Sequence, residues 1–295
     1  MVAAGDVLGE AFPDLAIASV EPLGEGWDHV AVLVNDELVF RIPWALVEAS
    51  GPAPGCGAEV ALLRAVAGRL PVRVPEPVHV APNAAFFGYR YLPGPSVQDD
   101  LAAGRDLAAL AVDVVLAIET LVPVAAGRAM GLPEHADPRH DPSPARATLT
   151  RGLVDGTVRA VAERVLGDFT DRWARAAARH LAVAHADLGL DHWLVDRAGG
   201  VYALIDWSDA CIAPPEQQLS TLMWDLPDLA GEAVAAYRER TGIQLDPQLV
   251  FAAGYLNALG DVHELLDEGD DDEGIERCLM FLETWADRGV EGVCA

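Results

Sequence analysis

The sequence predicts an α+β fold with two lobes, a small β-rich N-terminal lobe and a larger, mainly helical C-terminal lobe. Three observations support this prediction. The first ninety residues contain short β-branched runs separated by turn signals. A Pro-Gly-Pro break follows at residues 93–95. Beyond it, the chain is rich in Ala, Leu and Val with few turn residues, which favours helices. We therefore expect a division into residues 1–93 and 94–295.

The N-terminal lobe is expected to begin with three strands, over residues 17–23, 29–34 and 37–42. Each is a short run rich in β-branched residues. Asn35 and Asp36 lie between the second and third runs, and this pairing is typical of a hairpin turn. The second and third strands are therefore expected to pair with each other.

A helix over residues 58–70 is predicted by apolar side chains that recur every three or four positions. Several prolines then punctuate an extended segment. A further strand is expected over residues 85–92, where the Pro-Gly-Pro break ends it.

The C-terminal lobe is expected to contain long helices over residues 97–126 and 145–183, joined by a proline-containing loop. Two short apolar runs follow, at residues 193–195 and 201–205. Further helices are expected over residues 217–285. No internal repeat is visible, so the helices are predicted to form one lobe.

Composition limits the classes of partner. Of the 295 residues, 52% are hydrophobic, which is enough for a substantial core. The 46 acidic residues outnumber the 20 basic ones, and the formal net charge is −26. Such a charge repels nucleic acid and anionic membranes and attracts cations. We expect a small-molecule, cationic substrate and neither a nucleic-acid nor a membrane partner, although a general acidic bias would explain the same charge.

The sequence also predicts a cytoplasmic protein. Its four cysteines form no C-x-x-C pair, and none lies at zinc-finger spacing from a histidine. The first ten residues lack the basic region of a signal peptide, and no stretch of about 20 apolar residues is free of charge. We expect a reducing compartment, and a monomer as the simplest state.

The segment most typical of a catalytic site lies between residues 185 and 207. His185, Asp187 and His192 form the pattern H-x-D-x-x-x-x-H, and Ile205-Asp206-Trp207 follows after an apolar hairpin. Polar groups at the ends of apolar strands are where functional side chains converge. The H-x-D triplet alone is equally typical of a surface turn, but the ordered set is much more specific.

This ordered set resembles the aminoglycoside phosphotransferase family, which has the protein-kinase fold. The family pattern is H-G-D-x-x-x-x-N, then a strand and I-D-F/W. The resemblance implies that Asp187 is the catalytic base for a substrate hydroxyl and that Asp206 binds Mg²⁺ against the nucleotide phosphates. Most members have Asn at the position of His192. The aminoglycoside 2''-phosphotransferases and the macrolide phosphotransferases have His there, as this sequence does. A neutral imidazole can also ligate a metal.

The resemblance covers about residues 15–225 and extends to the N-terminal lobe. Gly24 and Gly26 lie in the segment G-E-G-W-D, which is similar to the loop that covers the nucleotide. Arg41 stands where kinases carry the phosphate-binding Lys, and Glu59 is its expected ion-pair partner. The alternative is that both are ordinary surface charges.

The resemblance also places a purine site at the link between the lobes. Tyr89 and Tyr91 lie where the predicted strand meets this link, and the purine ring of ATP or GTP is expected beside them. The sequence does not distinguish between the two nucleotides.

Two positions depart from the family pattern. Ala186 replaces a Gly or Asn. Gln218 stands where an Asp normally braces the catalytic loop by accepting backbone hydrogen bonds. An uncharged amide accepts a hydrogen bond that is weaker by about 1 kcal/mol. We expect this change to lower the efficiency of the enzyme rather than to abolish its chemistry.

The resemblance implies that the γ-phosphate of ATP or GTP is moved to a hydroxyl of an aminoglycoside, an activity that confers resistance. Asp191, Asp225 and Asp228 are expected to face the ammonium groups of such a substrate. The apolar residues 222–224 would suit a macrolide or another small hydroxyl compound instead. A kinase fold retained only for binding is the third hypothesis.

Overall fold

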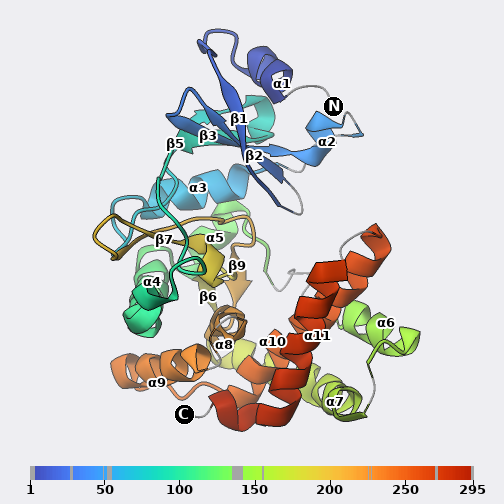
Figure 1. Cartoon of the computed structure of the whole chain (residues 1–295). Helices are drawn as coiled ribbons and strands as arrows, with labels where there is room; N and C mark the ends of the chain where they lie inside the picture. Colours follow the sequence, from blue (N-terminus) through green and yellow to red (C-terminus); the bar gives the residue numbers. More distant parts are fainter. Residues whose placement is uncertain are drawn as a thin grey trace.

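The computed structural model describes residues 4–26, 29–48, 50–51, 55–134, 142–154, 156–224, 226, 228–269 and 272–293. It confirms the predicted α+β architecture. A small antiparallel sheet lies at one end of the molecule, and a larger, mainly helical part lies at the other (Figure 1). The predicted division of the chain at residue 93 stays a prediction.

The sheet of the N-terminal lobe has the strand order β1-β2-β3-β5-β4, and every neighbouring pair is antiparallel. Asn35 and Asp36 both have positive φ between β2 and β3, which confirms the predicted hairpin turn. The strands of this sheet are β1 (Val20–Glu25), β2 (His29–Val34), β3 (Leu38–Pro43), β4 (Pro77–Val80) and β5 (Phe87–Arg90).

The two faces of this sheet pack against different partners. Successive side chains of a strand point to opposite faces. Phe40 packs in a separate core with α1 (Ala4–Ala11) and α2 (Trp44–Val47). Its neighbour Val39 belongs to the main core, which includes α3 (Gly57–Val66) and continues into the C-terminal lobe. Figure 1 shows α3 between the sheet and the C-terminal lobe, so the sheet is held to the lobe that carries the catalytic segment.

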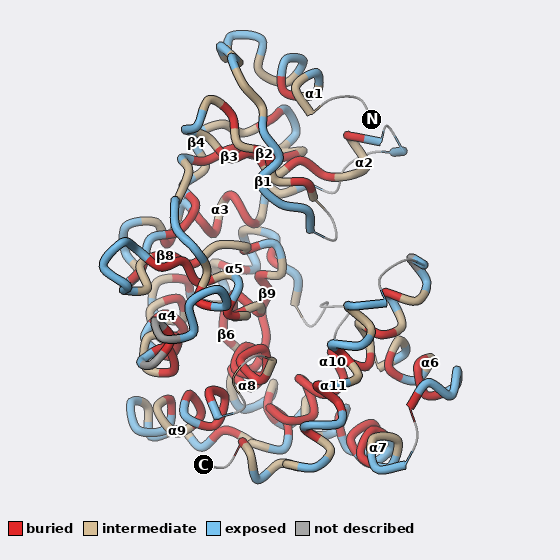
Figure 2. The backbone as a smooth tube through the Cα atoms, viewed as in Figure 1, coloured by how far each residue is buried: buried red, intermediate tan, exposed pale blue. Residues whose placement is uncertain are grey.

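The C-terminal lobe combines helices with two short antiparallel ribbons, β6 with β9 and β7 with β8. The buried residues gather along β6, β9 and α8 (Figure 2). The strands are β6 (Ala182–Ala184), β7 (Trp193–Val195), β8 (Val201–Leu204) and β9 (Cys211–Ala213). The helices are α4 (Leu107–Leu121), α5 (Val124–Met130), α6 (Ser143–Arg151), α7 (Gly156–Arg179), α8 (Pro215–Ser220), α9 (Leu229–Thr241), α10 (Pro247–Glu268) and α11 (Asp272–Arg288).

The two long helices predicted for this lobe were wrong in their extent. The first is divided at Pro123 into α4 and α5, because proline cannot donate the helical hydrogen bond. The second is divided at Gly152, which has the left-handed φ of 73° that ends α6. Residues 182–184 form the strand β6 rather than the end of a helix. A short apolar run fits a buried strand and a buried helical turn equally well.

A sharp turn connects β5 to the C-terminal lobe. Gly94 has a φ of 142°, and a Cβ atom at this position would lie 2.2 Å from the carbonyl oxygen of Val195. Only glycine fits this approach. Beside it, the Tyr202 hydroxyl donates a hydrogen bond of 2.6 Å to the Pro93 carbonyl. This contact holds the connection against the β7–β8 hairpin.

No single helix among the described residues is long and apolar enough to cross a membrane. In the part of the chain that the structure describes, one pair of helices, α4 and α5, satisfies the criteria of length and composition when taken together, and the pair is bent by 77° at its break.

Candidate active site

The catalytic segment predicted from the sequence folds around the two short ribbons. The loop from His185 to Gly189 follows β6 directly, and Asp206 follows β8. The amide of Ile205 donates a hydrogen bond of 3.0 Å to the carbonyl of His192. This bond brings Asp206 beside the segment that follows the loop, at His192.

Two residues of this site have left-handed backbone conformations. Ala186 has a φ of 66° and Asp206 a φ of 61°. Asp adopts this region more readily than most residues, whereas Ala does not. The conformation explains why the resemblance implies Gly or Asn at position 186, and Ala186 therefore holds the loop at some cost in backbone strain.

His185 is a structural part of the loop. Its Nδ1 atom accepts a hydrogen bond of 3.2 Å from the Asp187 amide, and its Nε2 atom lies 3.0 Å from the Ile205 carbonyl. This pattern requires the neutral ring with the proton on Nε2. The ring is fully buried, with an edge contact to Trp207. Burial first, and His192 second, lower its pKa to about 3.

We predict that His185 makes the fold sensitive to acid. Its pKa rises from about 3 in the folded chain to about 6.5 on unfolding, so the unfolded state binds more protons between these values. Stability therefore falls as the pH falls through this window. The free energy of unfolding at pH 5 should be about 2 kcal/mol lower than at pH 7 from this group alone. Urea unfolding measures this difference, and His185→Gln should reduce it; an unchanged difference would contradict the assignment.

Gln218 braces the same loop from α8, as predicted. Its Oε1 atom accepts the buried His185 amide at 2.5 Å. Thr221 adds a second support, because its hydroxyl accepts the Leu188 amide at 2.9 Å. The neutral amide therefore makes the contact that the sequence analysis assigned to the usual Asp.

Replacing Gln218 by Leu should lower stability by about 1–3 kcal/mol, because the His185 amide would stay buried without an acceptor. The activity should fall as well, since this amide begins the catalytic loop. Thermal unfolding and a steady-state assay measure the two effects. Gln217→Leu is the matched control: the Gln217 side chain is also buried in α8 but has no hydrogen-bond partner among the residues that the structure describes. Equal destabilisation by the two changes would contradict a bracing role for Gln218.

His192 lies among three carboxylates. Its Nδ1 atom is 3.7 Å from an oxygen of Asp187, and its Nε2 atom is 3.5 Å from Asp191 and 3.7 Å from Asp206. Burial alone would lower the pKa of His192, but these carboxylates outweigh it and raise the pKa. The structure thus gathers three of the predicted site residues around the imidazole of His192.

Arg41 connects this group to the N-terminal lobe. Its guanidinium lies 3.0 Å from Glu59 on α3 and 2.6 Å from Asp206. The Arg41 and Glu59 side chains are only 14% and 10% exposed, so they are not ordinary surface charges. Burial works against the charge of Arg41, but the two carboxylates outweigh it and raise the pKa of Arg41. The predicted pair of Arg41 with Glu59 is confirmed.

Burial has opposite outcomes for the two carboxyl groups beside Arg41. Burial raises the pKa of Glu59 to about 7 even though Arg41 pulls it down. Burial also disfavours the charge of Asp206, but Arg41 and His192 outweigh it and keep the pKa of Asp206 well below its usual range. Asp206 is therefore the carboxylate that stays ionised and can bind a cation.

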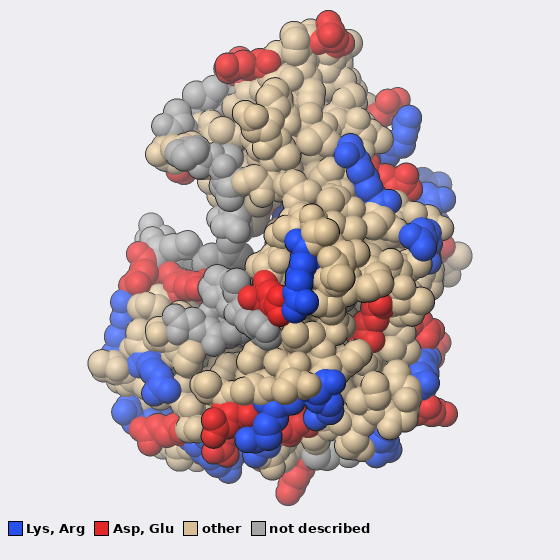
Figure 3. Space-filling model, turned by 180° about the vertical axis from the view of Figure 1, so that it is seen from behind, with Lys and Arg blue, Asp and Glu red and all other residues tan. Residues whose placement is uncertain are grey.

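A cavity of about 250 Å³ adjoins these residues, and its lining includes Glu59, Trp207 and Ser208. Figure 3 shows the molecule hollowed between its two lobes, with Asp and Glu side chains on the lower rim of the hollow. The site therefore lies where both lobes contribute side chains around an open space.

Comparison with known proteins decides the family. The model of the phosphotransferase enzyme family matches residues 19–254. This chain belongs to that family. No curated protein sequence matches it.

Solved structures of other phosphotransferases have the same fold. The GDP complex of wild-type aminoglycoside 2'-phosphotransferase-IIIa is similar with a TM-score of 0.75 and 23% identity, over 97% of this chain and 98% of its own. The GDP and kanamycin complex of APH(2")-IIIa has a TM-score of 0.71 and 22% identity, over 96% and 98%. The apoenzyme of a macrolide 2'-phosphotransferase from Brachybacterium faecium has a TM-score of 0.59 and 21% identity, over 96% and 98%.

The sequence analysis assigns Mg²⁺ to His192 and Asp206 of this phosphotransferase, and this role stays a prediction. The Nε2 atom of His192 and an oxygen of Asp206 lie 3.7 Å apart. Within the described ranges, no group of three or more His, Cys, Asp or Glu side chains comes together to hold a metal ion. A cation bound here would need further ligands, such as the phosphates of a nucleotide and water molecules. Mg²⁺ is usually bound by one or two carboxylates together with substrate phosphates and water.

The remaining residues predicted to bind the nucleotide lie in the N-terminal lobe. Gly24 is in β1, and the carbonyl of Gly26 accepts a hydrogen bond of 2.9 Å from the Trp44 indole. Tyr89 is buried in the main core, and burial raises its pKa. Tyr91 is half-buried, and its amide donates to the Glu37 carbonyl. Tyr89 thus packs as a core residue, and the nucleotide roles of these positions stay predictions.

The residues predicted to bind the substrate are dispersed. Asp191 is 55% exposed beside His192. Asp228 lies at the start of α9 and pairs with Arg288 near the C-terminus. Asp225 lies outside the described residues. Of the two candidates that the structure describes, Asp191 lies in the carboxylate group around His192 and Asp228 does not.

Ser208 belongs to the site, although the sequence analysis did not select it. Its hydroxyl donates to Asp206 at 2.9 Å and lies 3.3 Å from the Arg41 guanidinium. A serine two residues after the predicted metal ligand was the available signal. It orients one oxygen of Asp206, which leaves the other oxygen toward His192.

Proposed function

We propose that this phosphotransferase moves the γ-phosphate of ATP or GTP to a hydroxyl of an aminoglycoside and so confers resistance. The observation that carries the proposal is the convergence of Asp187, His192, Asp206 and Arg41 between the lobes. Phosphoryl transfer needs a base for the hydroxyl, a cation site and a positive charge for the phosphates. These four side chains supply all three.

In the proposed mechanism, Asp187 accepts the proton of the substrate hydroxyl. The hydroxyl oxygen forms a bond to the γ-phosphorus, while the bond from phosphorus to the leaving nucleoside diphosphate breaks. Asp206 and His192 would hold Mg²⁺, which would supply charge neutralisation for the phosphates. Arg41, oriented by Glu59, leaves its contact with Asp206 and pairs with phosphate oxygens. Positioning and charge stabilisation account for such catalysis, so no covalent enzyme intermediate forms.

Two observations favour an aminoglycoside as the acceptor. Asp191 is exposed next to the proposed metal ligand His192, where it can pair with an ammonium group. In addition, two of the apolar residues that suggested a macrolide are core residues. Leu222 and Met223 are at most 2% exposed, so they are not available to line a groove for a lactone ring. Trp224 is half-buried and stacks on Phe281.

The nucleotide donor, the oligomeric state and the cellular compartment are also proposals. GDP is bound in two of the similar structures, which supports testing GTP beside ATP. We propose a monomer that works in the cytoplasm with Mg²⁺. None of the described cysteines forms a disulfide, which fits a reducing compartment.

A nucleotide-consumption assay with Mg²⁺ and either ATP or GTP tests the proposal, with aminoglycosides, macrolides and simple hydroxyl metabolites as acceptors. We expect stimulation by aminoglycosides alone. Asp191→Asn should lower kcat/KM for an aminoglycoside about tenfold, because a charge-assisted hydrogen bond is lost. Stimulation by macrolides alone would replace the substrate class, and bound nucleotide without turnover on any acceptor would contradict the proposed activity.

A further inference from the structure

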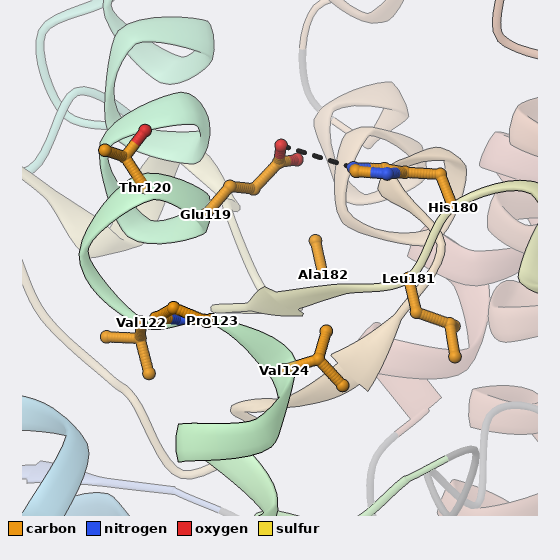
Figure 4. A pocket seen from close by; sticks show the side chains of 8 residues that line it. All are labelled: Glu119, Thr120, Val122, Pro123, Val124, His180, Leu181 and Ala182. Carbon is orange, nitrogen blue, oxygen red and sulfur yellow. Dashed lines mark hydrogen bonds and ion pairs between the residues drawn. The ribbon is translucent and has the colours of Figure 1, made fainter.

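A second cavity lies on the C-terminal lobe, and it shares no lining residue with the site described above. Its volume is about 320 Å³. It lies between the end of α4, the start of α5 and the junction of α7 with β6 (Figure 4). The side chains that line it are those of Glu119, Thr120, Val122, Pro123, Val124, His180, Leu181 and Ala182.

One end of this cavity is polar. Figure 4 shows Glu119 and His180 pointing toward each other from opposite sides of the cavity, and their Oε2 and Nε2 atoms are 3.3 Å apart. The Tyr237 hydroxyl donates to the other oxygen of Glu119 at 3.3 Å. Glu119 is 15% exposed, and burial raises its pKa although His180 opposes this. The proposed phosphoryl transfer uses none of these groups.

The rest of the cavity is apolar. Val122, Pro123 and Val124 form one wall, and Leu181 and Ala182 form another. The Thr120 hydroxyl does not add a free polar group, because it donates to the Leu116 carbonyl in its own helix. An apolar cavity with a few convergent polar groups is the usual form of a small-molecule site.

The charges of this cavity select the class of ligand. A largely buried carboxylate is costly unless an opposite charge or strong donors compensate it. Glu119 already lies 3.3 Å from His180 and accepts from Tyr237. An anionic ligand would add repulsion to this carboxylate, whereas an ammonium group adds an opposite charge and further donors.

We propose that this cavity is a second binding site, which takes a small amphiphilic amine. Its ammonium group pairs with Glu119 beside His180, and its hydrocarbon body packs against Pro123, Val124 and Leu181. The site is independent of the proposed phosphoryl transfer.

Calorimetric titration of the full chain with cyclohexylmethylamine tests the proposal, with cyclohexylmethanol as the neutral probe of matched shape. We expect the amine to bind at one site and about tenfold more tightly than the alcohol. Glu119→Gln keeps the shape and the acceptor for Tyr237 but removes the charge, so it should weaken the amine about tenfold.

Two further variants distinguish binding in this cavity from binding at the candidate active site. Val124→Trp should block amine binding by filling the cavity. If Glu119→Gln does not fold, Val124→Trp still tests whether the amine binds in this cavity. Asp191→Asn should leave amine binding unchanged. The proposal is overturned if wild type does not bind the amine, if the folded Glu119→Gln or Val124→Trp variant binds it as tightly as wild type, or if Asp191→Asn abolishes binding.

Discussion

The variant Asp187→Asn is expected to lose phosphoryl transfer by about 10²- to 10⁴-fold in kcat while it still binds the nucleotide. An amide cannot accept the proton of the substrate hydroxyl, but it preserves the size of the side chain. The contacts of Arg41, Glu59 and Asp206 do not involve Asp187, so the affinity for ATP or GTP should change little. Single-turnover kinetics and nucleotide titration measure the two quantities.

Asp171→Asn is the matched control for this variant. Asp171 is exposed on α7, so the exchange removes the same charge away from the site. This control should retain the activity of wild type. A variant at Asp187 that kept more than about a tenth of the wild-type kcat would contradict a role as general base.

The second large effect is expected from Arg41→Met. The change leaves Glu59 buried without its partner and removes one cation from Asp206. Breaking a buried ion pair by removing one partner costs about 3–5 kcal/mol of stability. Nucleotide affinity should fall as well, since the phosphates lose a guanidinium. Urea unfolding and nucleotide titration measure the two losses.

A double variant separates stability from function at this pair. Arg41→Met combined with Glu59→Met replaces both charges by apolar side chains, and such exchanges are often neutral for stability. The double variant should therefore recover most of the stability but not the nucleotide affinity. Recovery of both would mean that Arg41 has only a structural role. Failure to recover stability would mean that the pair with Glu59 is not the source of the loss.

The candidate site was predictable to the extent that its residues share a local pattern. Asp187, His192 and Asp206 lie within one stretch of sequence, and two hairpin-like ribbons are enough to bring them together. The pairing of Arg41 with Glu59 was also expected, because they occupy neighbouring elements of one lobe. The contact of Arg41 with Asp206 was not, since 165 residues separate them and it depends on how the lobes pack.

For the fold as well, features set by neighbouring residues were predictable from the sequence, whereas features set by distant residues were not. The hairpin at Asn35 follows from the positive φ values that its residues tolerate. The breaks at Pro123 and Gly152 had visible signals, but the apolar periodicity on both sides concealed them. β6 could not be assigned from its three apolar residues, because its partner β9 lies about 30 residues away and only the tertiary structure brings the two together.

The contact between Arg41 and Asp206 also affects how nucleotide affinity should be interpreted. In the proposed mechanism, the guanidinium already contacts Glu59 and Asp206 when it meets a nucleotide, so the phosphates would compete with Asp206 for it. A titration therefore measures the exchange of one set of ion pairs for another. The enthalpy of binding should be smaller than the new phosphate contacts alone suggest, and the released Asp206 becomes available to the cation that accompanies the nucleotide.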